Sequence, residues 1–218
     1  MKRLIGIFGL SGFARECADI AEAVGYDVVF IAAAGEDIPI EMDKKTVVYE
    51  ENISEIRDAS FIIGAGNGAV REKIASKYSG QLTFCNLIHP AASFGSGVLQ
   101  EIEKRIGIII CAGVRMTNNI QVGDFCIFNL NATVGHDCEI GDFVTIAPLA
   151  SISGNVFLSA RVSIGTGANL NNGESSKKLT IGRNTSIGSG AVVVTDCEAD
   201  SVYAGVPARL LRSFRPGG

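Results

Sequence analysis

From about residue 98 onward, bulky apolar residues recur at every sixth position of the chain. The unbroken part of this series is Val122, Phe128, Val134, Ile140, Ile146, Ile152, Leu158, Ile164 and Leu170. If about half of all residues are apolar, nine consecutive hits have a chance probability of about 0.002. A second apolar series precedes the first by two residues, and a glycine that we expect to permit a tight corner often follows, as at Gly123 and Gly135. The period predicts a three-sided solenoid in which each six-residue unit forms one short strand and one corner.

The first 88 residues show a different pattern, in which apolar strands alternate with amphipathic helices. We expect strands and helices in the order 4–8 (strand), 13–24 (helix), 27–33 and 61–64 (strands), 69–78 (helix) and 82–88 (strand). Strands separated by short helices are typical of a parallel α/β sheet with right-handed crossovers. We therefore expect an α/β domain over residues 1–88 and an all-β parallel solenoid over residues 89–218.

Composition and charge narrow the class of protein. The chain is 47% apolar and 19% charged, as in globular proteins. A net charge of -4 and an isoelectric point of about 5.3 argue against nucleic-acid or anionic-membrane partners. The sequence has no uninterrupted apolar run long enough to cross a bilayer, so we expect no membrane-spanning helix. The six cysteines form no CxxC pair, which favours reduced thiols and a cytoplasmic location.

Several segments match motifs of a known family: residues 8–12, 63–67 with Arg71, 88–90, 134–138 and 204–209. With them, the chain resembles the bacterial sugar O-/N-acyltransferases of the sialic-acid O-acetyltransferase (NeuD) and bacillosamine acetyltransferase (PglD) type. The resemblance covers nearly the whole chain. It implies an α/β Rossmann-like domain that binds a nucleotide sugar, followed by a left-handed parallel β-helix of hexapeptide repeats. The left hand comes from the resemblance, because the six-residue period does not determine it.

His136 is the main candidate for chemistry. It stands two positions after the interior residue Val134, so the register predicts an outward-facing side chain at a corner. Imidazole titrates near neutrality and can accept a proton as an amine or hydroxyl attacks an acyl carbonyl. The resemblance places the catalytic base at His136 and an assisting carboxylate at Asp137. Direct support of His136 by Asp137 requires a corner conformation, because consecutive side chains of an extended segment point apart. Ordinary surface roles for both residues remain open.

The resemblance implies acetyl-coenzyme A as the acyl donor, bound by Thr145, Gly154, Thr166 and Gly190. Gly154 would donate its backbone N–H to the developing oxyanion, with a plain turn glycine as the alternative. Thr145 stands where the family often has a second histidine, nine residues after the base.

An insertion interrupts the six-residue period near the end of the repeat. The spacing from Leu170 to Ile181 is eleven residues, which predicts a polar loop at 171–178 that leaves the solenoid. Its Lys177 and Lys178 either contact cofactor phosphates or lie on a solvated surface.

The same resemblance implies a nucleotide-linked sugar bound by Gly9, Ser11, Gly12, Phe13, Asn67, Arg71 and Asn129. A glycine turn between a strand and a helix suits phosphate binding, although the turn falls short of a full GxGxxG motif. Alanines at 32–34 replace the acidic residues that usually end the second strand, which leaves the identity of the nucleotide open. For Asn129, a structural role in the ladder of coils is an alternative.

A metal site is not expected. Zinc-binding relatives among β-helix proteins use three histidines, and this chain has two, His89 and His136. We expect an acetyl-CoA-dependent N-acetyltransferase of a nucleotide-linked amino-dideoxy sugar, used in surface polysaccharide biosynthesis. It would be a homotrimer with active sites between subunits. O-acetylation of sialic acid or another sugar, and a non-catalytic ligand-binding solenoid, are the alternatives.

Overall fold

The computed structural model describes residues 3–42 and 44–214. In the N-terminal domain, the central strand β1 (Arg3–Phe8) pairs in parallel with β2 (Tyr26–Ala32) and with β4 (Ser60–Ile63). Strands β3 (Val47–Tyr49) and β5 (Thr83–Phe84) complete the sheet in the order β3-β2-β1-β4-β5. The chain reverses its direction of winding at β1, and ligands of such sheets bind beside that point, outside the carboxyl ends of the strands.

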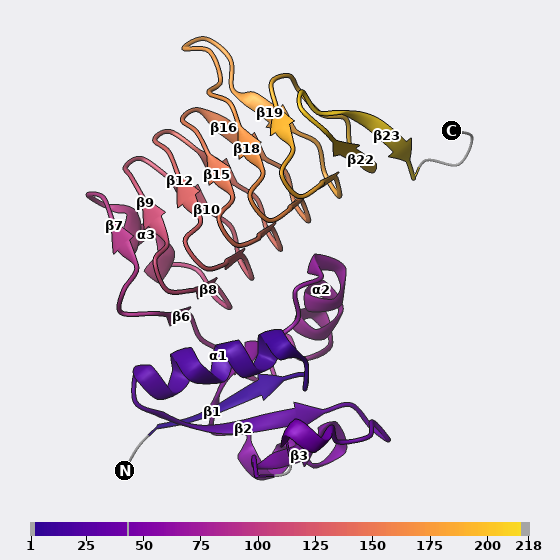
Figure 1. The fold of residues 1–218 in the computed structure, drawn as a ribbon. Coiled ribbons are helices and arrows are strands. Elements are labelled where there is room, and N and C mark those ends of the chain that lie inside the picture. The colour runs from indigo at the N-terminus through magenta and orange to yellow at the C-terminus, as the bar shows by residue number, and fades with distance from the viewer. Residues whose placement is uncertain (1–2, 43, 215–218) are drawn as a thin grey trace.

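Helices α1 (Gly12–Ala23) and α2 (Gly68–Lys77) begin at this carboxyl edge. The short 3-10 segments η1 (Ile40–Met42) and η2 (Glu50–Ile56) flank β3. Helix α1 buries an apolar stripe that packs between the sheet and the first coils of the β-helix (Figure 1). This packing joins the two domains through one continuous apolar cluster.

The second part of the chain is a β-helix of short parallel strands, in which three six-residue units form one regular coil and each strand pairs with its counterpart in the next coil. One face comprises β6 (Leu87–Ile88), β8 (Ile109–Ile110), β11 (Ile127–Phe128), β14 (Thr145–Ile146), β17 (Ser163–Ile164) and β20 (Ser186–Ile187). The next comprises β7 (Ser93–Phe94), β9 (Arg115–Met116), β12 (Thr133–Val134), β15 (Ser151–Ile152), β18 (Asn169–Leu170) and β21 (Val192–Val193). The third comprises β10 (Gln121–Val122), β13 (Glu139–Ile140), β16 (Val156–Leu158) and β19 (Leu179–Ile181).

Both apolar series point into the β-helix, as the six-residue period predicts. The bulky positions from Val122 to Leu170 are at most 4% exposed, and the second series is equally buried. The polar loop at 171–178 leaves the solenoid as expected (Figure 1). It lengthens one coil, yet Leu158 still pairs with Ile181 in register. The predicted α/β domain and hexapeptide β-helix are thus confirmed.

The corners differ from expectation in one respect. They are formed by residues with positive φ at a six-residue spacing, such as Asn119 (φ 53°), Asp137 (φ 61°) and Asn155 (φ 58°). Asn and Asp tolerate this conformation better than most residues. The glycines after the bulky positions serve close packing between coils instead. A Cβ at Gly135 would lie 2.6 Å from the backbone nitrogen of Gly154.

The ends of the β-helix also depart from the simple period. The short helix α3 (Val98–Glu103) takes the place of a strand near the start, with Val98 and Ile102 buried in the core. The single strand predicted over 82–88 is wrong, because β5 joins the N-terminal sheet whereas β6 pairs with β8. At the other end, β22 (Ser201–Ala204) and β23 (Arg209–Ser213) form an antiparallel hairpin beside β20.

The six cysteines, all within the described ranges, are free thiols, and burial raises the pKa of Cys126 to about 12. None of the described helices has the length and apolarity that crossing a membrane requires.

Candidate active site

Two adjacent columns of residues run along the edge of the β-helix that follows the face of β12. One column is Asn118, His136, Gly154 and Asn172, and its neighbour is Asn119, Asp137, Asn155 and Gly173. Backbone hydrogen bonds link them from coil to coil: the N–H of Asn155 donates to the carbonyl of His136 (2.7 Å), and that of Gly173 to Gly154 (3.0 Å). Residues one coil apart in the sequence are therefore neighbours at this edge.

His136 and Asp137 contact each other directly. Nδ1 of His136 lies 2.6 Å from Oδ2 of Asp137, because the positive φ of Asp137 supplies the corner conformation that the pair requires. Since a carboxylate only accepts, Nδ1 donates this hydrogen bond, and in the neutral ring Nε2 then keeps the lone pair. The side chains of His136 and Asp137 are 58% and 46% exposed, so the imidazole is accessible.

Asn119, one coil before Asp137, is a partner that the sequence reasoning missed. Its Nδ2 donates to Oδ1 of Asp137 at 2.5 Å. This hydrogen bond, followed by that of His136, lowers the pKa of Asp137 below its ordinary value. Counting back three six-residue units from Asp137 would have identified it. The three side chains form a chain of hydrogen bonds that orients the imidazole.

Gly154 makes room for the imidazole. A Cβ at this position would lie 2.6 Å from both Cε1 and Nε2 of His136. Its N–H, the expected oxyanion donor, donates to Oδ1 of Asn172 at 2.9 Å in this structure. Gly154 thus adjoins the candidate base, and its part in binding an oxyanion stays a prediction.

These residues line an open hollow of about 560 Å³, with the loop at 171–178 as one wall. Lys178 donates to the backbone carbonyl of Asp137 and forms an ion pair with Glu139 (3.3 Å). Lys177 forms an ion pair with Asp196 at 2.6 Å. Both lysines therefore interact with other groups of the protein. Lys178 stabilises the corner that carries Asp137 through its hydrogen bond to the Asp137 carbonyl.

The other expected cofactor positions lie elsewhere in the chain. Thr166 and Gly190 stand at the edge that follows the face of β11, where the N–H of Gly190 donates to the carbonyl of Thr166 (2.9 Å). Asn129 lies on the same edge, and its Oδ1 accepts from the N–H of Leu130 (2.7 Å). Thr145 donates to the carbonyl of Gly66 in the N-terminal domain at 2.8 Å. Within a single chain, Thr145, Thr166, Gly190 and Asn129 therefore lie apart from His136.

The expectation that Arg71 binds substrate is corrected by its environment. The side chain is completely buried between the domains. Its N–H groups donate at 2.8–3.0 Å to the carbonyls of Phe125, Ala65, Gly66, Phe143 and Val144. Burial lowers the pKa of Arg71 to about 10, so it remains charged at neutral pH. All five N–H groups of the guanidinium are used in these hydrogen bonds, so Arg71 has no donor left for a ligand. Its contacts instead link α2 to the β-helix.

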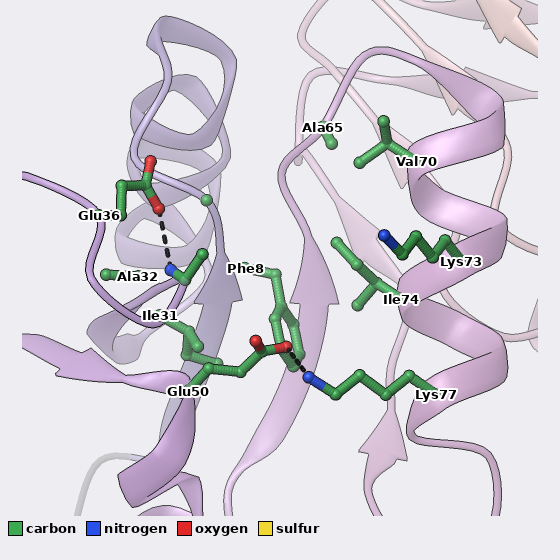
Figure 2. A pocket seen from close by; sticks show the side chains of 12 residues that line it. Phe8, Ile31, Ala32, Glu36, Glu50, Ala65, Val70, Lys73, Ile74 and Lys77 are labelled. Carbon is green, nitrogen blue, oxygen red and sulfur yellow. Dashed lines mark hydrogen bonds and ion pairs between the residues drawn. The ribbon is translucent and has the colours of Figure 1, made fainter.

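A second cavity, of about 390 Å³, opens at the carboxyl ends of β1, β2 and β4 (Figure 2). Of the expected substrate residues, Gly9 lines it. Ser11 and Asn67 instead cap α1 and α2 beside it, each accepting hydrogen bonds from the first turn of its helix. Gly12 and Phe13 belong to the first turn of α1, where Phe13 packs against the core.

Charged side chains in this cavity were missed by the sequence reasoning. Glu36 follows β2, and its carboxylate accepts from the N–H of Ala33 at 2.9 Å. It supplies an acidic group two residues beyond the alanines at 32–34. On the opposite wall, Lys73 and Lys77 extend from α2, and Lys77 forms an ion pair with Glu50 at 2.9 Å (Figure 2). The four-residue spacing of the lysines on a predicted helix was the available signal.

Comparison with known proteins agrees with both domains. Residues 4–78 match the family model of the PglD N-terminal domain. The GDP-perosamine N-acetyltransferase of Escherichia coli O157:H7 is 39% identical over 106 residues, which cover 49% of this chain and 48% of that protein. A solved perosamine N-acetyltransferase of Caulobacter crescentus, in complex with CoA and GDP-perosamine, covers 96% of this chain and 97% of its own, with 25% identity and a TM-score of 0.83. The chain is thus similar to PglD-type sugar acetyltransferases over both of its domains.

A second similar solved structure is the acetyltransferase domain of PglB from Neisseria gonorrhoeae FA1090, in complex with acetyl coenzyme A. It has 26% identity and a TM-score of 0.82, over 97% of this chain and all of that one. The chain spans about half the length of the curated relatives that it matches. Among the residues that the structure describes, no group of three or more His, Cys, Asp and Glu side chains is arranged to hold a metal ion.

Proposed function

We propose that this protein is a PglD-type, acetyl-CoA-dependent N-acetyltransferase acting on the amino group of a nucleotide-linked amino-dideoxy sugar. The observation that carries the proposal is the 2.6 Å contact between Nδ1 of His136 and Asp137 at an open hollow, because in the neutral ring this contact leaves the lone pair on Nε2. The activity of the E. coli relative supports an amino sugar as acceptor and makes GDP-perosamine the first compound to test.

The reaction follows from this geometry. The acceptor amine attacks the thioester carbonyl carbon, which forms the C–N bond and moves an electron pair onto the carbonyl oxygen. Nε2 of His136 takes a proton from the amine, and Asp137 stabilises the resulting imidazolium. Collapse of the tetrahedral intermediate breaks the C–S bond, and the proton passes from His136 to the departing sulfur. The products are the N-acetylated sugar and free coenzyme A.

The cavity of the N-terminal domain is our proposed site for the nucleotide. It lies at the carboxyl edge of the sheet, the place where open α/β sheets bind ligands. The N-terminus of α1, with Ser11 and Gly12, favours an anionic phosphate. Lys73 adds a positive charge on the opposite wall. We propose Gly9 and Asn67 as further contacts and assign no direct contact to Arg71.

We extend the proposal to a homotrimer of cytoplasmic subunits that serve surface polysaccharide biosynthesis. Asn129, Thr166 and Gly190 lie on a different edge from His136, so a neighbouring subunit must supply them if they contact the same cofactor. Leu130 and Leu149 on that edge are 40% and 62% exposed, which favours burial against another protein surface.

The test is release of coenzyme A thiol from acetyl-CoA with GDP-, UDP-, dTDP- and CMP-linked amino sugars, with product masses to locate the acetyl group. We expect turnover with at least one of them and a loss of turnover in His136→Ala with cofactor binding retained. Binding of acetyl-CoA without thiol release from any amino sugar or sialic acid would instead favour a non-catalytic solenoid. Acetylation of a sialic acid hydroxyl would favour the O-acetyltransferase alternative.

A further inference from the structure

The last residue of the inserted loop, Lys178, reaches back to the corner that carries Asp137. Glu139, Phe157 and Thr180 pair in register on three successive coils. Counting back two residues from each of them places Lys178 two coils away from Asp137. The side chain of Lys178 spans the coil between them, and its ammonium group donates to the Asp137 carbonyl and lies 3.3 Å from Oε1 of Glu139. A segment outside the six-residue period is thus tied to this corner.

The corner at Asp137 depends on a backbone conformation that most side chains disfavour. Asp137 has a positive φ of 61°, and this conformation brings its carboxylate to Nδ1 of His136. The peptide group after Asp137 must keep its orientation for the contact to persist. One coil further on, the carbonyl of Asn155 accepts the backbone N–H of Leu179 (3.1 Å). Among the described residues, no backbone N–H donates to the Asp137 carbonyl, and Lys178 supplies its donor.

The two lysines of the loop differ in exposure and in their relation to the site. The side chain of Lys177 is 69% exposed and pairs with Asp196, whereas that of Lys178 is 29% exposed. Lys178 also lies among the residues that line the hollow beside His136. Of the two lysines, Lys178 is therefore the one that the protein holds against the candidate base.

We propose that Lys178 is a positioning residue for acetyl transfer: its ammonium group holds the corner conformation that keeps Asp137 on Nδ1 of His136. The inference rests on the proposed acetyltransferase function. In the neutral ring the Asp137 contact leaves the lone pair on Nε2, so a relaxed corner would let the proton occupy Nε2 and remove the base. Glu139 keeps the ammonium group in place through its ion pair. The insertion at 171–178 thus acts on the base through the backbone of Asp137.

The kinetic test compares Lys178→Met, which keeps an apolar stem and removes the donor, with Lys178→Arg, which keeps a charge and donors. Lys177→Met is the matched control, because it removes an equal charge from the neighbouring position. We expect kcat to fall by about 10- to 10²-fold in Lys178→Met, since small displacements of catalytic groups have effects of that size. KM and Kd for acetyl-CoA should be unchanged. Lys178→Arg should recover part of kcat, and Lys177→Met should retain all of it.

A second readout needs neither acetyl-CoA nor a sugar. The nitrogen NMR shifts of a neutral imidazole report which ring nitrogen carries the proton. His136 should show the proton on Nδ1, whereas His89, whose Nδ1 accepts the N–H of Ala91 at 2.9 Å, should show it on Nε2. In Lys178→Met we expect the His136 shifts to move towards a mixture of the two forms and the His89 shifts to stay constant. A merely structural role would lower stability and leave both tautomers unchanged.

Two results would overturn the proposal. If Lys178 binds the cofactor, Lys178→Met raises Kd for acetyl-CoA but leaves kcat and the His136 tautomer unchanged. If Lys178 only stabilises the fold, Lys178→Met lowers Tm with normal kcat and a normal tautomer. A wild-type protein that binds acetyl-CoA but releases no thiol would refute the proposed function itself, and the His136 tautomer would still decide whether Lys178 positions the ring.

Discussion

The imidazole of His136 rests against Gly154, where even a methyl group would stand 2.6 Å from Cε1 and Nε2 of the ring. The candidate base is therefore held from two directions, by Asp137 at Nδ1 and by the adjacent coil beneath the ring. Glycine at 154 is a requirement of this arrangement.

Gly154→Ala is expected to push the imidazole out of position and to lower kcat by about 10²-fold, since small displacements of catalytic groups have effects of that size. Steady-state kinetics with a melting curve measures it. Gly123→Ala is the matched control, because its Cβ would meet the backbone of Asp142 in another coil at 2.6 Å, away from His136. The control should lose stability but keep its kcat, and equal kinetic losses in both variants would contradict the prediction.

Asn119→Ala is expected to raise the pKa of Asp137 towards its ordinary value, because the Asn119 hydrogen bond is the main cause of its lowering. A lowered pKa keeps the carboxylate charged to lower pH, and its support of His136 is lost as pH falls through that pKa. In the variant this loss begins at a higher pH. Carboxyl NMR titration of Asp137 in the wild type and in the variant measures it. A pKa of Asp137 that does not move would refute the assigned cause.

Arg71→Met is expected to destabilise the fold by more than about 3 kcal/mol, because buried carbonyls that lose a donor cost about 1–3 kcal/mol each. The comparison variant is Arg161→Ala, which removes the partly exposed ion pair with Glu72 at 2.8 Å. Such a pair contributes about 0–1 kcal/mol. Denaturant unfolding of both variants measures the difference, and equal losses would show that Arg71 does not join the domains.

Lys73→Ala is expected to raise KM for the nucleotide sugar about tenfold and to leave KM for acetyl-CoA unchanged, since Lys73 lines the cavity of the N-terminal domain. Lys104→Ala is the control, because Lys104 pairs with Glu101 on α3 (2.8 Å), away from that cavity. An equal change in both Michaelis constants would argue against a nucleotide in this cavity.

Leu149→Glu tests the homotrimer. Leu149 is 62% exposed on the edge that carries Asn129 and Thr166, and a buried charge there disfavours association. Light scattering is expected to report a mass of three chains for the wild type and of one chain for the variant, with loss of activity. Ile40→Glu alters an 86% exposed residue of the N-terminal domain and should change neither. A wild-type protein that is monomeric and active would contradict the assembly.

The β-helix was predictable because its rule is local: each interior position repeats after six residues, from Val122 to Leu170. The outward position of His136 follows from the same register. The six-residue period did not predict helix α3. The buried residues of this helix, Val98 and Ile102, are four residues apart, which is a helical spacing.

The partners of His136 depend on contacts between coils. Asn119 and Asn172 each lie one coil away in the sequence from Asp137 and Gly154, respectively, and meet them only once the coils stack. Arg71 similarly reaches the carbonyls of Phe125 and Phe143, far along the chain in the β-helix. Nothing in the segment around Arg71 distinguishes a bridge between domains from a ligand contact.

The extra five residues of the coil at 171–178 are accommodated entirely outside the prism, since Leu158 and Ile181 pair as if the coil had its usual length. Loops of other lengths and compositions can therefore be grafted at this corner without repacking the interior. The loop residues that line the hollow beside His136 can therefore vary without a change in the apolar interior. Changes in this loop alone could give the same β-helix a different acceptor preference.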